Sequence, residues 1–196
     1  MDKEPNEQKR FMNMKSIFVV LACLVSSSLA CYQQGTCHDW SKLNNEPVCF
    51  EGRNNKPGIF KPSFEGFVAA VKLVHRSGNI VCGQLAGSHT SNWGCHAWPH
   101  LVNSPLNILV TNEHNDVIFP KAGATFTRGV HKNGKWYSVQ GFDSRSESLV
   151  LLHSFNAPYY LGPKSHLKIW YGEDLLNYYE GDNVGRVCVD VYGYFA

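Results

Sequence analysis

The chain has 196 residues, of which 43% are hydrophobic, 13% aromatic and 17% charged, and its formal net charge is +2. This composition is typical of one globular domain and excludes an intrinsically disordered chain. The small net charge gives no basis for a nucleic-acid partner, because phosphate backbones are bound by clusters of Lys and Arg.

The first thirty residues predict a secretory signal peptide. Basic residues precede a short apolar run over 17–25, and small side chains end the segment at Ala30. This order is typical of signal peptides, and the run is too short to span a bilayer. We therefore predict cleavage after Ala30, a secreted extracellular protein and no membrane span. The long polar stretch at the start leaves Met12 or Met14 as alternative starts of translation.

Six cysteines remain after the predicted signal peptide is removed. They are Cys31, Cys37, Cys49, Cys82, Cys95 and Cys188. An even number in an oxidising compartment predicts three disulfides, and the sequence leaves their pairing open. Because 31–57 holds half of these cysteines and many Asn, Gly and Pro residues, we predict a disulfide-pinned N-terminal segment with little regular structure there. A β-sandwich domain is predicted over 58–196.

Short apolar segments separated by turn residues follow from residue 58 onward. A buried strand is predicted over 67–74, followed by a turn over Arg76–Asn79 that leads to a partner strand. The segment 83–106 has no clear periodicity and predicts a long loop. A hairpin is expected around Asn133–Gly134, because both residues tolerate positive φ. The remaining expected strands cover 80–82, 107–111, 116–119, 124–127, 135–140, 148–153, 166–171 and 186–195. Of these, 107–111 and 116–119 are expected to form a hairpin. In 166–171, Leu167, Ile169 and Tyr171 alternate with their neighbours, which is typical of a half-buried strand.

Frequent short strands without a clear amphipathic helix predict an all-β protein. We expect an antiparallel β-sandwich of the jelly-roll type, with at most a short helix within 175–179. Its core is expected to contain one face of each strand, including Phe119, Phe126, Trp136, Val150, Leu152, Ile169, Val189 and Val191.

An acidic loop lies between the last two expected strands. It contains five side chains with oxygen donors, namely Glu173, Asp174, Glu180, Asp182 and Asn183. Calcium prefers several such oxygens. The loop therefore predicts a calcium site formed by Glu173, Asp174, Asp182 and Asn183. The alternative is a solvated turn without a ligand.

Aromatic side chains near this loop and within 83–106 are candidates for contacts with a ligand. Aromatic rings provide apolar faces against which the apolar face of a sugar can stack. The predicted ligand-binding residues are Tyr171, Tyr178, Tyr179, Trp93 and Trp98, with His96 as a further candidate.

No common catalytic or phosphate-binding motif is present in the sequence. The chain has no G-x-S-x-G, no H-E-x-x-H and no glycine-rich phosphate loop, so we do not predict an enzyme. Cys82, Cys95, His96 and His100 include the ligand types of a zinc site, but disulfides are the default for cysteines of a secreted protein.

The C-terminal stretch carries a resemblance to known proteins. The run WYGEDL (170–175), Glu180 and the pattern DN-x-G-x-VC-x-DVY (182–192) resemble the end of a secreted β-rich domain of cnidarian extracellular and skeletal organic matrix proteins. The DN-x-G run with its final alternating strand is also similar to the ends of calcium-dependent galactose-binding sandwich lectins. The lectin similarity implies calcium at Asp182 and Asn183.

Two functions follow as expectations. One is a secreted, disulfide-stabilised module that binds an extracellular glycan or matrix component with the help of calcium. The other is a structural extracellular-matrix or biomineral-associated protein without a discrete ligand site. The absence of an acidic tract disfavours strong binding to mineral.

Overall fold

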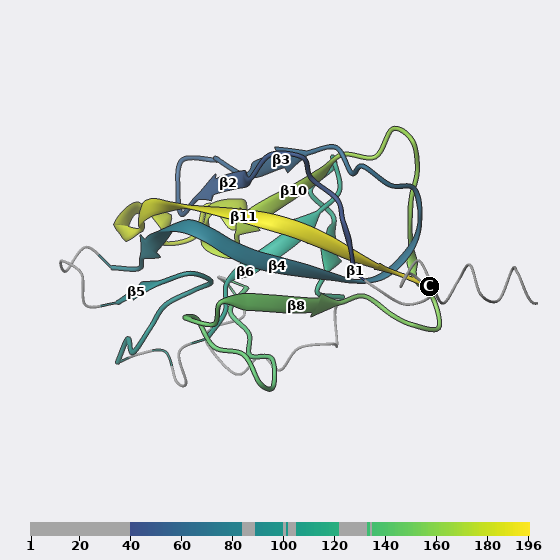
Figure 1. Cartoon of the computed structure of the whole chain (residues 1–196). Coiled ribbons are helices and arrows are strands. Elements are labelled where there is room, and N and C mark those ends of the chain that lie inside the picture. The colour runs from purple at the N-terminus through teal and green to yellow at the C-terminus, as the bar shows by residue number, and fades with distance from the viewer. Residues whose placement is uncertain (1–39, 84–88, 100, 102–104, 122–132, 134) are drawn as a thin grey trace, which may run out of the picture. The chain divides into compact units, whose positions relative to one another are not determined.

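Two antiparallel β-sheets form the part of the chain that the structure describes (Figure 1). The structure is a computed structural model, and it describes residues 40–83, 89–99, 101, 105–121, 133 and 135–196. The prediction of an all-β antiparallel sandwich is confirmed. The predicted signal peptide, Cys31, Cys37, His100 and the expected strand over 124–127 with Phe126 lie outside the described residues.

The larger sheet has seven strands within the described residues. They are β1 (Trp40–Lys42), β2 (Val48–Glu51), β4 (Gly66–Val81), β5 (Thr90–Ser91), β8 (Ser148–Leu152), β9 (Tyr159–Leu161) and β11 (Val184–Phe195). The two longest, β4 and β11, pair with each other and run side by side through the domain in Figure 1. The other five strands of this sheet pair with one or the other of these two.

The smaller sheet has four strands among the described residues. They are β3 (Gly58–Phe60), β6 (Ile108–Thr111), β7 (Val117–Phe119) and β10 (Leu167–Tyr171). The predicted hairpin of 107–111 with 116–119 is confirmed, because β6 pairs antiparallel with β7. The alternation expected in 166–171 is also observed, since Leu167, Ile169 and Tyr171 are buried.

The N-terminal boundary of the sandwich differs from the prediction. Residues 40–57 were expected to lie outside the sandwich, yet β1 and β2 both pair with β11. Among the described residues, the sandwich therefore includes the chain from Trp40 onward. The turn residues of this segment only connect the strands. The two strands were not predicted because each is short and the segment is rich in cysteine and turn residues.

The turn predicted over Arg76–Asn79 is wrong. These residues belong to the continuous strand β4, where the register against β11 shifts at a bulge between Cys188 and Val189. Gly78 has a φ of 77° inside the strand, and a Cβ atom there would lie 2.0 Å from the carbonyl oxygen of Arg186. A glycine inside a strand often marks a bulge of this kind rather than a turn.

The core lies between the sheets and combines side chains from both. Phe119, Trp136, Ile169, Val189 and Val191 are buried as predicted. The prediction for β8 is wrong by one residue, because its buried side chains are Leu149 and Leu151. The expected core members Val150 and Leu152 lie on the other face, and Leu152 is 40% exposed.

The described residues contain no helix that is both long enough and apolar enough to cross a membrane.

Candidate functional site

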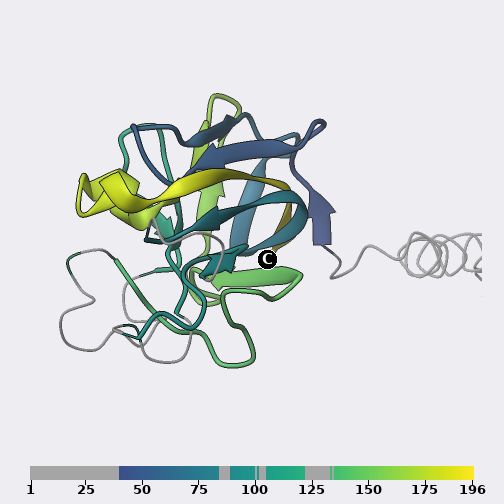
Figure 2. The ribbon, with the colours of Figure 1, turned by 90° about the vertical axis from the view of Figure 1, so that its left-hand side faces the viewer.

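The acidic loop connects the two sheets at one end of the sandwich. It follows β10 of the smaller sheet and precedes β11 of the larger sheet, and it contains the short helix α2 (Gly172–Leu176) and the 3-10 turn η2 (Glu180–Asp182). Figure 2 views the domain from the end at which β11 begins, where this segment projects. The short helix expected within 175–179 therefore lies slightly earlier in the chain.

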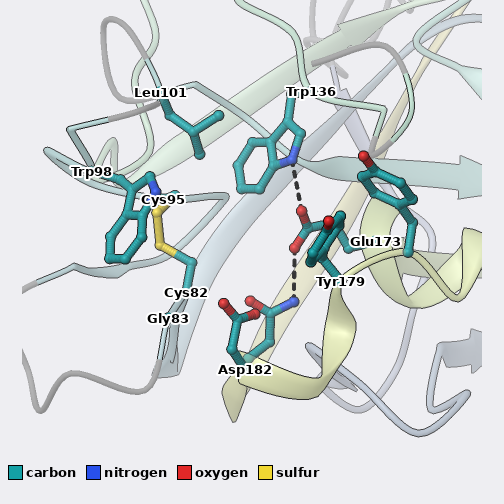
Figure 3. A pocket seen from close by; sticks show the side chains of 11 residues that line it. Cys82, Gly83, Cys95, Trp98, Leu101, Trp136, Glu173, Tyr179 and Asp182 are labelled. Atoms are coloured by element: carbon teal, nitrogen blue, oxygen red, sulfur yellow. Dashed lines mark hydrogen bonds between the residues drawn. A yellow bond between two sulfur atoms is a disulfide. The ribbon is translucent and has the colours of Figure 1, made fainter. Parts of the chain in front are cut away.

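A pocket of about 500 Å³ lies beside this loop (Figure 3). Its walls come from the two residues after β4, from Cys95, Trp98 and Leu101, from Trp136 and from the acidic loop. It is lined by Cys82, Gly83, Cys95, Trp98, Leu101, Trp136, Glu173, Tyr178, Tyr179, Asp182 and Asn183. Its volume lies within the range of roughly 300–1,000 Å³ that is typical of small-molecule sites.

Glu173 places a buried carboxylate in this pocket. Its Oε1 accepts a hydrogen bond of 2.9 Å from Trp136 Nε1, and its Oε2 accepts one of 3.0 Å from Asn183 Nδ2. Burial raises the pKa of the Glu173 carboxyl, the two donors oppose this shift, and the negative charge of Asp182 adds to it. Glu173 and Asp182 thus place two negative charges at the same pocket, and a bound cation would stabilise both charges.

Asn183 is fully buried, and its amide orientation is fixed by two acceptors. Its Nδ2 donates to the carbonyl oxygen of Gly52 at 3.2 Å and to Glu173 Oε2 at 3.0 Å. Its Oδ1 finds no hydrogen-bond donor among the described residues. A buried acceptor without a partner costs free energy, so this oxygen is suited to receive a ligand.

Asp174 faces a different partner from its neighbour Glu173. Its two carboxylate oxygens accept hydrogen bonds from the backbone nitrogens of Asn55 at 2.6 Å and Lys56 at 3.0 Å. Burial, followed by an interaction with Glu180, raises the pKa of Asp174 to about 6. The structure does not bring Asp174 to the pocket with the other predicted calcium ligands, because this side chain holds the turn around Asn55.

The predicted aromatic contacts divide into two groups. Tyr178, Tyr179 and Trp98 line the pocket, and the side chain of Tyr179 is 74% exposed. Tyr171 and Trp93 are fully buried, and each donates a hydrogen bond to a backbone carbonyl in the interior. The prediction that Tyr171 and Trp93 offer stacking faces is wrong, because β-sheet packing covers both rings.

Two disulfides are present among the described residues. Cys49 is joined to Cys188, and Cys82 is joined to Cys95. The second bond excludes the zinc alternative that used both Cys82 and Cys95. The third predicted disulfide would involve residues outside the described part of the chain.

Three of the lining residues, Trp136, Leu101 and Gly83, were not expected at a site from the sequence. Trp136 was expected in the core, where it does lie, but its indole nitrogen also donates to Glu173. Leu101 and Gly83 carry no recognisable sequence signal. For Trp136 a signal existed, since a buried indole N–H usually requires an acceptor.

The oxygen donors of the pocket suit a calcium ion better than a transition metal. In the described part of the chain, no three His, Cys, Asp or Glu side chains are grouped closely enough to hold a metal ion. A calcium ion at this pocket would have the carboxylates of Glu173 and Asp182 and the amide oxygen of Asn183 as its side-chain ligands. Its remaining ligands would be backbone carbonyls, water or hydroxyl groups of a bound molecule.

Comparison with solved structures identifies a similar protein, AJLec from the sea anemone Anthopleura japonica. The two sequences are 47% identical, the TM-score is 0.76, and the similarity covers 82% of this chain and 99% of that chain. No family model matches the sequence, and no curated protein matches it significantly.

Proposed function

The chain belongs to the same family as AJLec of Anthopleura japonica, and on this premise we propose that it is a secreted carbohydrate-binding protein. The name of AJLec denotes a lectin, that is, a protein that binds sugars without converting them. The proposed binding site is the pocket that contains Glu173, Asp182 and Asn183. An extracellular glycan is the proposed partner.

The unpaired Oδ1 of Asn183 is the observation that carries this proposal. Its amide nitrogen is already used by Gly52 and Glu173, so the side chain cannot turn to satisfy the oxygen from within the protein. A calcium ion or a sugar hydroxyl would supply the missing interaction. Asn183 lines the pocket, so either partner would approach the oxygen from that side.

Calcium would also offset the repulsion between Glu173 and Asp182. Burial is the main cause of the raised pKa of Glu173, and the nearby negative charge of Asp182 adds to it, as expected for two carboxylates that repel each other. Once bound, calcium can coordinate sugar hydroxyls directly as part of its six to eight oxygen ligands. Tyr179, whose ring is exposed at the pocket, offers an apolar face to the same sugar.

Thermal melting in EDTA and in millimolar calcium tests the metal part of the proposal. A site occupied at about 100 times its dissociation constant adds about 2.7 kcal/mol to the free energy of unfolding. We expect this gain in the native protein and its loss in Asp182→Ala. Glu65→Ala is the matched control, because Glu65 is an exposed acid next to the start of β4. An equal calcium response in Asp182→Ala would remove this residue from the site.

Binding to a glycan array tests the sugar part. We expect binding to a defined group of glycans that EDTA abolishes and added calcium restores. A protein that binds calcium weakly at many positions and binds no glycan would instead fit the structural matrix protein considered from the sequence.

A further inference from the structure

The pocket has two chemically different sides. Glu173, Asp182 and Asn183 supply charged and polar oxygens on one side. The other side, here called the apolar wall, consists of Trp98, Leu101 and the Cys82–Cys95 disulfide. Figure 3 shows the apolar wall across the pocket from Glu173 and Asp182, with Trp136 between the two sides.

Several contacts hold the apolar wall in place. The ring of His89 packs edge-on against Trp98 at 4.7 Å between centroids, and its Nδ1 lies 2.9 Å from the carbonyl oxygen of His96. The backbone of Gly83 lies so close to the indole that a Cβ atom would be 2.9 Å from it. Trp98 is therefore positioned before any ligand arrives, which lowers the entropic cost of binding against it.

We infer that the apolar wall is a second subsite, which binds a ring linked to the sugar held by the polar side. The inference rests on the proposed function and specifies the ligand as a glycoside with a ring substituent rather than a free monosaccharide. A single sugar ring coordinated through its hydroxyls uses the polar side and leaves the apolar wall in contact with water. A linked ring with an apolar face would cover Trp98 and gain the energy of stacking.

The test compares methyl glycosides with para-nitrophenyl glycosides of galactose, glucose and mannose, as both anomers, by titration calorimetry in calcium. For the sugar that binds, we expect the para-nitrophenyl glycoside to bind about fivefold more tightly than the methyl glycoside. The methyl glycoside is the internal reference. In Trp98→Ala the ratio of the two affinities should fall towards one, whereas Trp98→Phe should keep most of the ratio because it retains a ring.

The matched control is Trp40→Ala. Trp40 is a half-buried tryptophan on β1 that packs against Tyr194 instead of lining the pocket. We expect this variant to keep the full ratio. Leu101→Ser provides a second test of the apolar wall if Trp98→Ala does not fold, and it should also reduce the ratio.

Two different failures can be told apart. Equal affinities of the native protein for methyl and para-nitrophenyl glycosides, or a ratio that survives in Trp98→Ala and Leu101→Ser, would overturn the second subsite and leave the proposed function intact. Failure to bind any glycoside would overturn the proposed function, and the subsite with it. Disaccharides of the same sugar identify the natural substituent, since they show the gain only if the apolar wall accepts a second sugar ring.

Discussion

The side chain of Glu173 is buried, yet the proposed site uses its carboxyl group in the charged form. Its side chain is 8% exposed, and it keeps two hydrogen-bond donors, Trp136 and Asn183, that favour the ionised form. Burial outweighs these donors and raises the pKa of the carboxyl. In the proposed calcium site, a proton and a calcium ion would therefore compete for Glu173, and the proton would compete at a higher pH than at an exposed glutamate.

This competition leads to a pH-dependent calcium response. Protonation of Glu173 removes the charge that attracts the cation, so the calcium-induced rise in melting temperature should decrease as the pH falls through the raised pKa of Glu173. The decrease should begin above the ordinary glutamate value of about 4.3. Melting curves with and without calcium at a series of pH values measure it.

Glu173→Gln provides the variant for the same measurement. The amide nitrogen of glutamine would face one of the two donors, so we expect a loss of about 1–3 kcal/mol in the free energy of unfolding. The variant should also lack the calcium response at every pH. A native calcium response that stays constant down to about pH 4.3 would contradict the role given to Glu173.

At the scale of elements, the turn between β2 and β3 supports the site from outside the pocket. Asn54 and Asn55 have positive φ values of 68° and 55°, and their backbone nitrogens donate to Glu180 and Asp174. The carbonyl oxygen of Gly52 accepts from Asn183. The acidic loop thus fixes this turn, and the turn in return fixes the amide of Asn183.

The close approach of β4 to β11 at Gly78, next to the bulge, can be tested with a pair of glycines. Gly78 and Gly141 both have positive φ, 77° and 84°, but a Cβ atom would meet the Arg186 backbone at Gly78 and nothing within 4 Å at Gly141. Alanine in the left-handed region costs about 1–2 kcal/mol. We expect Gly141→Ala to lose about that much stability in urea denaturation and Gly78→Ala to lose several kcal/mol more. Equal losses would mean that β11 moves away from the new Cβ atom at position 78 without any loss of stability.

The sequence predicts the type of fold better than it predicts which face of each strand is buried. The sandwich follows from frequent turns and from the alternation in 166–171, whereas β8 reads Ser-Leu-Val-Leu-Leu, in which consecutive apolar residues do not indicate the buried face. The acidic loop is recognisable as a candidate site, but Glu173 and Asp174 point to different partners. That division depends on the direction in which α2 leaves β10, which no local pattern specifies.

The apolar wall of the pocket could not be predicted from the sequence. Trp98 and Leu101 lie in a segment without periodicity, and the disulfide that completes the wall is one of many possible pairings. These residues meet the acidic loop only because β4 and β11 pair along their length, which brings Cys82 at the end of β4 next to the start of β11.

The two described disulfides differ in the length of chain that they close and in their place in the domain. The Cys49–Cys188 bond joins β2 to β11 and spans 139 residues of sequence, whereas the Cys82–Cys95 bond spans 13 residues and lies at the pocket. In the chain-entropy description, a disulfide restricts the unfolded chain more when it closes a longer loop. The first bond should therefore mainly stabilise the fold, and the second should mainly shape the site.

Two double variants separate these effects. Replacing Cys49 and Cys188 by alanine should lower the free energy of unfolding by about 4–5 kcal/mol, and replacing Cys82 and Cys95 by about 3 kcal/mol. The first variant should melt at a lower temperature but retain the calcium-induced rise in melting temperature, because its bond does not line the pocket. The second should lose much of the preference for para-nitrophenyl glycosides, because its bond forms part of the apolar wall. Urea denaturation measures the free energies of unfolding, thermal melting measures the calcium response, and titration calorimetry measures the glycoside preference.

One outcome would contradict this division. If loss of the Cys49–Cys188 bond weakened ligand binding as much as loss of the Cys82–Cys95 bond, the pocket would depend on the whole sandwich rather than on its own wall.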